Sequence, residues 1–191
     1  MKKKILMWLI FALVAISAVQ AYTVTIQPGP TNSKDTWISS ANESGYNQTK
    51  LNSGRYWTSL RQEYWTFIQF DYSNLNITNS TNVTATLQLY YYYGGSPRDQ
   101  IIYATNGTWS PNTLTWNNRP GVGQYYSNET LVSGSWYSWD VTQHVKSVKL
   151  NSMTNNGFII KNPSDTDYDY YYSSRYAGNV TLIPRLVVTI N

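Results

Sequence analysis

Short runs of alternating apolar and polar residues, separated by turn signals, decide what this chain can fold into. A period of two residues is typical of a β-strand with one buried face, and helical periodicity is rare in the chain. Turn signals such as Pro28-Gly29-Pro30 and Asn155-Asn156-Gly157 lie between the runs. The pattern predicts an all-β, two-sheet sandwich. Strands are expected at 22–26, 35–39, 64–70, 85–93, 100–105, 113–116, 136–139, 157–161, 168–174 and 185–190.

One short helix interrupts the strands. Asp140 is positioned to cap the first turn, and Gln143 occupies the reciprocal position of a capping box. Val141, Val145 and Val148 share one apolar face. We therefore expect roughly two turns of helix, packed across an edge or end of a sheet.

The N-terminus has the pattern of a secretion signal. Lys2, Lys3 and Lys4 precede an apolar run at 5–14, and small residues flank a cleavage point after Ala21. The run is short for a membrane span, which needs about 20 residues, although a retained anchor is the alternative. We predict a signal peptide at 1–21 and one extracellular or cell-surface domain at 22–191, with no membrane span after the signal is removed.

Charge and cysteine content exclude several function classes. The 14 Lys and Arg residues and 10 Asp and Glu residues give a net charge of +4. Removal of the three leader lysines leaves 11 against 10, a net charge of +1, with no basic cluster for nucleic acid. Cysteine is absent, so stability must come from the aromatic core, from bound ions or glycans, or from assembly.

Asn-X-Ser/Thr sequons are numerous, while only 13% of the residues are charged. Covalent N-glycans are therefore predicted to supply surface polarity. Three of the sequons fall in one expected loop. The candidate asparagines are Asn42, Asn47, Asn76, Asn79, Asn82, Asn106, Asn128 and Asn179.

Several separated motifs occur in an order that resembles a known family. They lie at 67–71, 85–90, 109–120, 139–142, 157–158 and 184–188. Together they are similar to the DNRLRE domain, also called disaggregatase-related, over roughly 35–190, nearly the whole expected domain. The resemblance implies a jelly-roll-like antiparallel β-sandwich of secreted and cell-surface proteins of archaea and bacteria. It also implies a relation to carbohydrate-binding modules that hold acidic polysaccharides such as alginate.

The resemblance assigns structural roles to three tryptophans and reveals one departure. Trp109, Trp116 and Trp139 occupy framework positions, so core packing is favoured over a sugar-stacking platform. Members of the family carry Ser-Arg-Glu near the second-last strand. Here the same stretch reads Ser174-Arg175-Tyr176, and the carboxylate is missing.

Two tyrosine-rich strands contain the candidate contact residues. In 87–93, Leu87, Leu89, Tyr91 and Tyr93 face one way, toward the core, and the alternate residues face outward. An exposed aromatic row is suited to stacking on sugar rings or to contact with another subunit, and ordinary core packing is the third reading. The candidate contact residues are Tyr90, Tyr92, Tyr168, Tyr170 and Tyr172.

The sequence offers weak material for a metal and none for catalysis. Asp165, Asp167 and Asp169 have the spacing of a calcium loop, but Tyr170 replaces its turn glycine and Tyr176 its glutamate. Calcium stays open, and solvated strand-edge carboxylates are the alternative. With no cysteine nucleophile, one histidine and no Gly-X-Ser-X-Gly element, we predict no catalytic residue, no enzyme and no other cofactor.

Two functions compete. The first is a glycosylated structural subunit of a cell-surface filament, sheath or matrix, motivated by a solitary domain without disulfides. Such a subunit is expected to self-associate by donor-strand exchange of Tyr22, Thr23, Val24, Thr25 and Ile26, swinging at 28–30. The alternative is a secreted carbohydrate-binding module that binds polysaccharide. The sequence favours assembly slightly.

Overall fold

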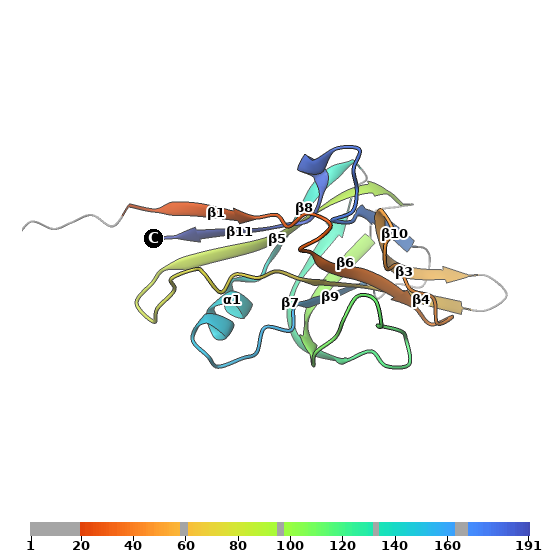
Figure 1. The fold of residues 1–191 in the computed structure, drawn as a ribbon, viewed down its shortest axis with the longest axis horizontal. Helices are drawn as coiled ribbons and strands as arrows, with labels where there is room; N and C mark the ends of the chain where they lie inside the picture. Colours follow the sequence, from red (N-terminus) through yellow and green to blue (C-terminus); the bar gives the residue numbers. More distant parts are fainter. Residues whose placement is uncertain (1–19, 58–60, 95–97, 132–133, 163–167) are drawn as a thin grey trace, which may run out of the picture.

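The computed structural model in Figure 1 describes residues 20–57, 61–94, 98–131, 134–162 and 168–191. The strands are β1 (Tyr22–Ile26), β2 (Lys34–Ser39), β3 (Lys50–Trp57), β4 (Arg61–Gln69), β5 (Val83–Tyr93), β6 (Arg98–Asn106), β7 (Gly121–Leu131), β8 (Ser135–Asp140), β9 (Phe158–Lys161), β10 (Tyr168–Tyr172) and β11 (Arg185–Ile190). The helix α1 (Thr142–Lys149) lies between β8 and β9, and the 3₁₀ turn η1 (Val180–Leu182) lies between β10 and β11. The predicted all-β fold with one short α-helix is confirmed.

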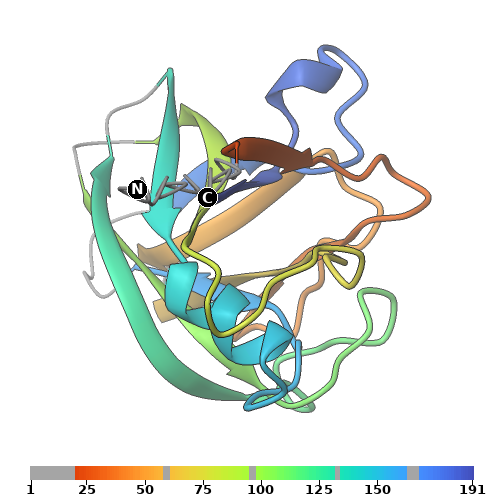
Figure 2. The same cartoon turned by 90° about the vertical axis from the view of Figure 1, so that its left-hand side faces the viewer.

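All strand pairs are antiparallel, and two long strands hold the sheet together. β5 pairs with β8 along one edge and with β11 and then β10 along the other. β4 pairs with β2 along one edge and with β3 and then β9 along the other. Because β10 also pairs with β3, one sheet curls into two layers, β1-β11-β5-β8 and β2-β4-β9-β6-β7 (Figure 2). This is the predicted antiparallel sandwich.

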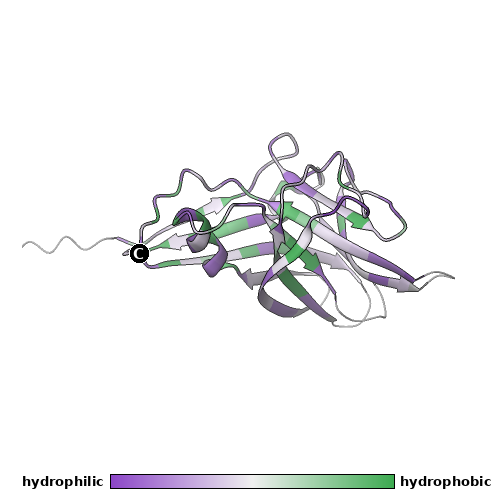
Figure 3. Cartoon of the chain, turned by 90° about the horizontal axis from the view of Figure 1, so that it is seen from below, coloured by the Kyte–Doolittle hydropathy of each residue, from purple (hydrophilic) through white to green (hydrophobic). Residues whose placement is uncertain are grey.

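The main core lies between the two layers. Leu87 and Leu89 of β5 are fully buried, as are Trp139 of β8 and Ile160 of β9. The Trp139 indole N–H donates to the Gln100 carbonyl (2.9 Å), so its polar atom is satisfied inside the core. Figure 3 shows hydrophobic and hydrophilic residues alternating along the strands. The predicted core role of Trp139 is confirmed.

A second, smaller core covers the outer face of β4 and β9. Phe67 and Ile159 point into it, and the loop 107–120 folds over them. Trp109 lies 5.5 Å from Phe67, and its indole N–H donates to a backbone carbonyl (2.8 Å). The Arg119 guanidinium lies 3.9 Å from the Trp116 ring and holds the end of the loop. The predicted packing role of Trp109 is therefore confirmed, and half-buried Trp116 packs beside it.

The strand predicted at 113–116 does not exist. These residues belong to the covering loop, where the side chain of Asn118 accepts from the Thr115 N–H (2.7 Å) and donates to the Thr113 carbonyl (2.8 Å). Backbone groups that a strand would pair are thus satisfied within the loop. The alternating apolar residues at 113–116 therefore do not mark a strand: Leu114 and Trp116 anchor the loop to the second core.

The helix α1 packs against the strand β5 (Figure 1). Its first turn does not form the capping box that the sequence predicted. Val141 is the N-cap residue, and Asp140 Oδ1 accepts from the Thr142 N–H (2.8 Å). The Gln143 amide donates forward to Ser147 Oγ (3.2 Å) rather than back to the cap. The buried Val141 and Val145 side chains hold the helix in place.

Two strands escaped prediction because neither alternates in polarity. β3 carries a central Asn-Ser-Gly-Arg, and β7 begins Gly-Val-Gly-Gln. Backbone pairing places them, β3 between β10 and β4 and β7 along β6. Other boundaries shift by a few residues. β9 starts at Phe158 because Gly157 has φ +79°, where any Cβ would lie 2.3 Å from the Ile68 carbonyl oxygen.

Candidate functional site

A continuous chain of aromatic rings runs over the sheet where β5 and β10 lie side by side. It includes all five tyrosines predicted as contact residues. Ring centroids are 4.3 Å apart for Tyr92 and Tyr172, 5.8 Å for Tyr90 and Tyr172, and 6.0 Å for Tyr92 and Tyr170. Tyr168 lies 4.9 Å from Tyr170. We call this surface the aromatic band, and its members are Trp136, Tyr90, Tyr176, Tyr172, Tyr92, Tyr170, Tyr168 and Tyr64.

Strand alternation turns these tyrosines away from the main core. On β10, Asp169 and Tyr171 are fully buried, whereas the three predicted contact tyrosines are half-buried. On β5, Tyr91 faces inward beside Tyr171. The sequence places Tyr93 with the core set, but this residue is 60% exposed. A bulge between Tyr170 and Tyr171 shifts the register at this end of the strand pair and turns Tyr93 outward.

Three rings of the band form a parallel stack. Tyr172 lies between Tyr92 (4.3 Å, interplanar angle 7°) and Tyr176 (3.7 Å, 13°). Two near-parallel neighbours this close must lie on opposite faces of the Tyr172 ring, so both of its faces are covered. The accessible part of the ring is its edge, with the phenolic hydroxyl. A ligand therefore meets the middle of the band through hydroxyl groups rather than through a flat platform.

The phenol groups of Tyr172 and Tyr64 are held in their neutral form. A hydrogen bond with Tyr176, followed by burial, raises the pKa of Tyr172 to about 12. Burial, with smaller effects of Glu43 and neighbouring tyrosines, raises the pKa of Tyr64 to about 12. At physiological pH these hydroxyls both donate and accept hydrogen bonds, as the hydroxyls of a sugar do.

The band ends on two further elements, with cations at its sides. At one end Trp136 of β8 lies 5.6 Å from Tyr90, and the Arg185 guanidinium lies 4.0 Å from the Trp136 ring. At the other end Tyr168 lies 5.8 Å from Tyr64 of β4. The Lys50 ammonium lies 4.2 Å from the Tyr170 ring. Aromatic surface thus combines with donors along its whole length.

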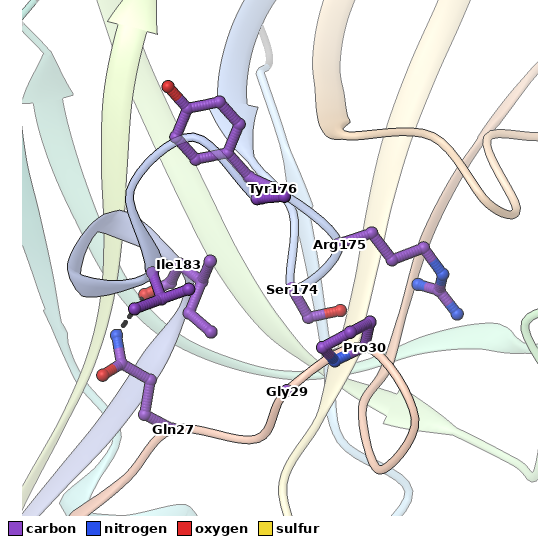
Figure 4. Close-up of a pocket in the computed structure, with 9 residues that line it drawn as sticks. Gln27, Gly29, Pro30, Ser174, Arg175, Tyr176 and Ile183 are labelled. Carbon is purple, nitrogen blue, oxygen red and sulfur yellow. Dashed lines mark hydrogen bonds between the residues drawn. The ribbon is translucent and has the colours of Figure 1, made fainter.

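A pocket of about 330 Å³ opens beside Tyr176, the last ring of the stack (Figure 4). The segment after β1 forms one wall, and the turn after β10 and residues near η1 form the others. Most of its lining is apolar. The lining residues are Gln27, Gly29, Pro30, Ser174, Arg175, Tyr176, Ala177, Val180 and Ile183.

A second pocket, of about 400 Å³, shares Pro30 and Arg175 with the first. Its lining is mostly hydroxyl and amide groups, including Ser33, Asn47 and Asn112. We call the two spaces the apolar pocket and the polar pocket. The two pockets are neighbours, because Pro30 and Arg175 line both of them.

Arg175 is charge-balanced in a way the sequence does not reveal. Its guanidinium donates to Asp35 Oδ1 (3.0 Å), and that carboxylate, 1% exposed, also accepts from the Ser174 N–H (2.8 Å). The residue after Arg175 is Tyr176, at the position where the resemblance drawn from the sequence implies a glutamate. Asp35 of β2 therefore supplies the carboxylate that the local motif lacks.

All eight sequon asparagines are exposed. The side-chain oxygen of Asn179 also accepts from the Thr181 N–H (3.0 Å) and caps η1. Asn47 lines the polar pocket, so a glycan there would occupy that space. Glycan occupancy stays a prediction.

The predicted assembly strand, Tyr22 to Ile26, is β1, and it pairs with β11 of its own chain from Tyr22 opposite Ile190 to Ile26 opposite Leu186. Val24 and Ile26 pack against the main core. Exchange of this strand between subunits stays a prediction. The predicted signal peptide, apart from Gln20 and Ala21, lies outside the described residues.

The calcium candidates are not brought together in what the structure describes. Asp165 and Asp167 lie outside the described residues. Asp169 is fully buried and accepts from the Tyr91 hydroxyl (2.8 Å) and the Gln100 amide, so it is not a solvated edge carboxylate. Across the described ranges, no three His, Asp or Glu side chains cluster as metal ligands. Within the same ranges, no helix has the length and apolarity needed to cross a membrane.

Several residues of the site were absent from the sequence-based set. Trp136, Tyr64 and Tyr176 complete the aromatic band, and Asp35 neutralises Arg175. Tyr176 had one usable signal, since it continues the period of two from Tyr172 past Ser174. The others come from strands whose neighbours the sequence does not specify.

The chain matches a known protein family over most of its length. Residues 29–190 match carbohydrate-binding module family 96. No curated protein matches the chain. The matched segment contains the whole aromatic band and nearly all of both pockets. The relation to carbohydrate-binding modules expected from the sequence is thus confirmed, while the narrower DNRLRE name is not.

Proposed function

The chain belongs to carbohydrate-binding module family 96, and from that premise we propose that it binds polysaccharide along the aromatic band and does not cleave it. The observation that carries the proposal is the continuity of the band. From Trp136 to Tyr64, successive ring centroids lie 4.3–6.0 Å apart across four strands. A surface of this extent suits a polymer better than a single sugar.

Recognition combines two interactions. The edges of the stacked rings present hydroxyl groups that exchange hydrogen bonds with sugar hydroxyls. The Tyr176 ring, the last of the stack, lines the apolar pocket and offers apolar surface for the C–H groups of a sugar ring. Lys50 and Arg185 add donors at the sides of the band.

The test removes hydroxyl groups without removing rings. A triple variant, Tyr92→Phe, Tyr170→Phe and Tyr176→Phe, keeps the packing of the stack. Each lost hydrogen bond costs about 0.5–1.5 kcal/mol, so each substitution weakens binding roughly 2- to 10-fold. Affinity gel electrophoresis against a panel of neutral and acidic polysaccharides measures the effect.

Tyr125→Phe is the matched control, because Tyr125 is 50% exposed on β7 and lies outside the band. We expect the control to bind as the unmodified protein does, and the triple variant to stay folded, with its rings still stacked, while losing at least about tenfold in affinity. Unchanged affinity of the triple variant would rule out the band as the binding surface.

A second candidate is the structural subunit of a cell-surface filament or matrix. One observation favours it: β1 ends the strand order, and among the described residues its second edge has no strand partner. Electron microscopy of the exported protein, with and without residues 22–30, tests this function. A truncated protein that folds as a stable monomer and assembles as before would count against strand exchange. Both candidates assume the export that the predicted signal peptide implies.

A further inference from the structure

The apolar pocket presents hydrophobic surface to solvent next to the aromatic band. Val180 is 65% exposed on its wall, while Ile183 is 5% exposed beneath it. Pro30, Ala177 and the Tyr176 ring complete the apolar lining. An exposed valine on the wall of a mostly apolar hollow offers hydrophobic surface to a ligand.

The polar groups at the rim are already satisfied by the protein. The Gln27 amide donates to the Ile183 carbonyl (2.8 Å), as the dashed line in Figure 4 marks. The Arg175 guanidinium is paired with Asp35 (3.0 Å), whose carboxylate balances its charge. The pocket therefore carries no surplus charge, and its ligand is neutral.

Size and position restrict the ligand further. About 330 Å³ is at the lower end of the range for ligand pockets and accommodates one substituted sugar unit rather than a chain. Tyr176 joins the pocket to the band, because its ring lines the pocket and also stacks on Tyr172 at 3.7 Å. A polysaccharide lying on the band thus places one of its units at the pocket mouth.

We propose that the apolar pocket binds an acetyl group on a sugar of the polysaccharide held by the aromatic band. The acetyl methyl group covers Val180 and Ile183, and its carbonyl group stays at the pocket mouth, where water bonds it. An unsubstituted sugar has only hydroxyl groups to offer these walls, and a carboxylate meets an arginine that is already neutralised. The inference rests on the proposed polysaccharide binding and adds the substituent that is recognised.

The test compares acetylated and unacetylated forms of one backbone. Acetylated glucomannan and the same polymer after alkaline deacetylation test an O-acetyl group. N-acetylchitohexaose and cellohexaose test an N-acetyl group on the same β-1,4 backbone. A small apolar group in a hydrophobic site changes affinity by roughly 10- to 200-fold, so calorimetry on the full chain should show at least about tenfold preference for one acetylated form.

Two variants assign that preference to the pocket. Val180→Asn makes the wall polar, and its exposure leaves the fold unaffected. Gly29→Leu fills the pocket from the opposite wall, where a Cβ meets nothing within 4 Å. Both should abolish the preference and keep the affinity for the unacetylated polymer. Leu150→Ser, at a 37% exposed site after α1, is the matched control and should keep the preference.

Equal affinity of the unmodified protein for acetylated and unacetylated polymers would overturn the inference and leave the proposed function standing, as would a preference that survives both pocket variants. Failure to bind any polysaccharide would overturn the proposed function itself.

Discussion

Acidification below neutral pH is expected to destabilise the domain through His144. This side chain is 1% exposed, lies 4.4 Å from the Phe158 ring, and has Nδ1 3.1 Å from the Tyr126 hydroxyl. Burial lowers the pKa of His144 from 6.5 to about 4, and a hydrogen bond with the Asn155 side chain opposes the shift in part. The folded state therefore favours the neutral imidazole.

The sign and size of the effect follow from linkage. The contribution of His144 is fully present above pH 6.5 and is lost as the pH falls toward 4, because over that interval only the unfolded chain binds the proton. Each pH unit is worth at most about 1.36 kcal/mol. Over about 2.5 pH units the loss reaches about 3 kcal/mol, a large fraction of the stability of a typical domain.

Urea unfolding at about pH 7 and about pH 4.5, followed by tryptophan fluorescence, measures this loss. The control is His144→Gln, which keeps a polar side chain at the site and cannot titrate. Carboxylates contribute equally to both proteins, so the difference in pH slope belongs to His144. We expect the variant to be less stable at neutral pH but to lose less on acidification. An identical slope in both proteins would refute the reasoning.

Two further predictions concern the core and the aromatic band. Trp139→Ala should lose about 3–5 kcal/mol of stability in chemical unfolding, while Trp136→Ala, three residues before on the same strand, should lose far less because Trp136 is half-buried at the surface. Because the pKa values of Tyr64 and Tyr172 rise from 10 to about 12, the folded state retains protons that the unfolded chain releases above pH 10. Stability should therefore fall as the pH rises from 10 toward 12, and spectrophotometric titration should show tyrosines ionising later in the folded protein than in denaturant.

The two candidate functions require different arrangements of the segment 27–30. The proposed polysaccharide binding would use the aromatic band and the pockets, which the strands β5 and β10 and the segment 27–30 position. Strand exchange uses β1, whose withdrawal from β11 would also displace Gln27, Gly29 and Pro30 from the pocket wall. Assembly by this route would thus dismantle the apolar pocket, so binding and exchange are coupled through 27–30.

Local pattern was sufficient for most of the strands, though not for β3 and β7, and for part of the site. β1 and β11 have the bounds predicted from their alternation, and the same rule turned Tyr90, Tyr92, Tyr168, Tyr170 and Tyr172 outward. It failed for Tyr93, where a bulge changed the register, and for 113–116, where a side chain satisfied the backbone. The orientation of Tyr93 depends on a strand distant in sequence, and the loop at 113–116 depends on local side-chain hydrogen bonds. Periodicity contains neither kind of information.

The sequence by itself determined that the chain is a β-sandwich whose strands have two different faces, because alternation and turn chemistry act between neighbours in the chain. The core role of Trp139 came from the family resemblance. Only the tertiary structure decided that β10 lies between β5 and β3, and that register brings Trp136, Tyr64 and Tyr176 into line with the predicted tyrosines. It likewise brought Asp35 to Arg175 across 140 residues. Pairing between distant strands depends on which edges and faces fit together, and no single strand contains that information.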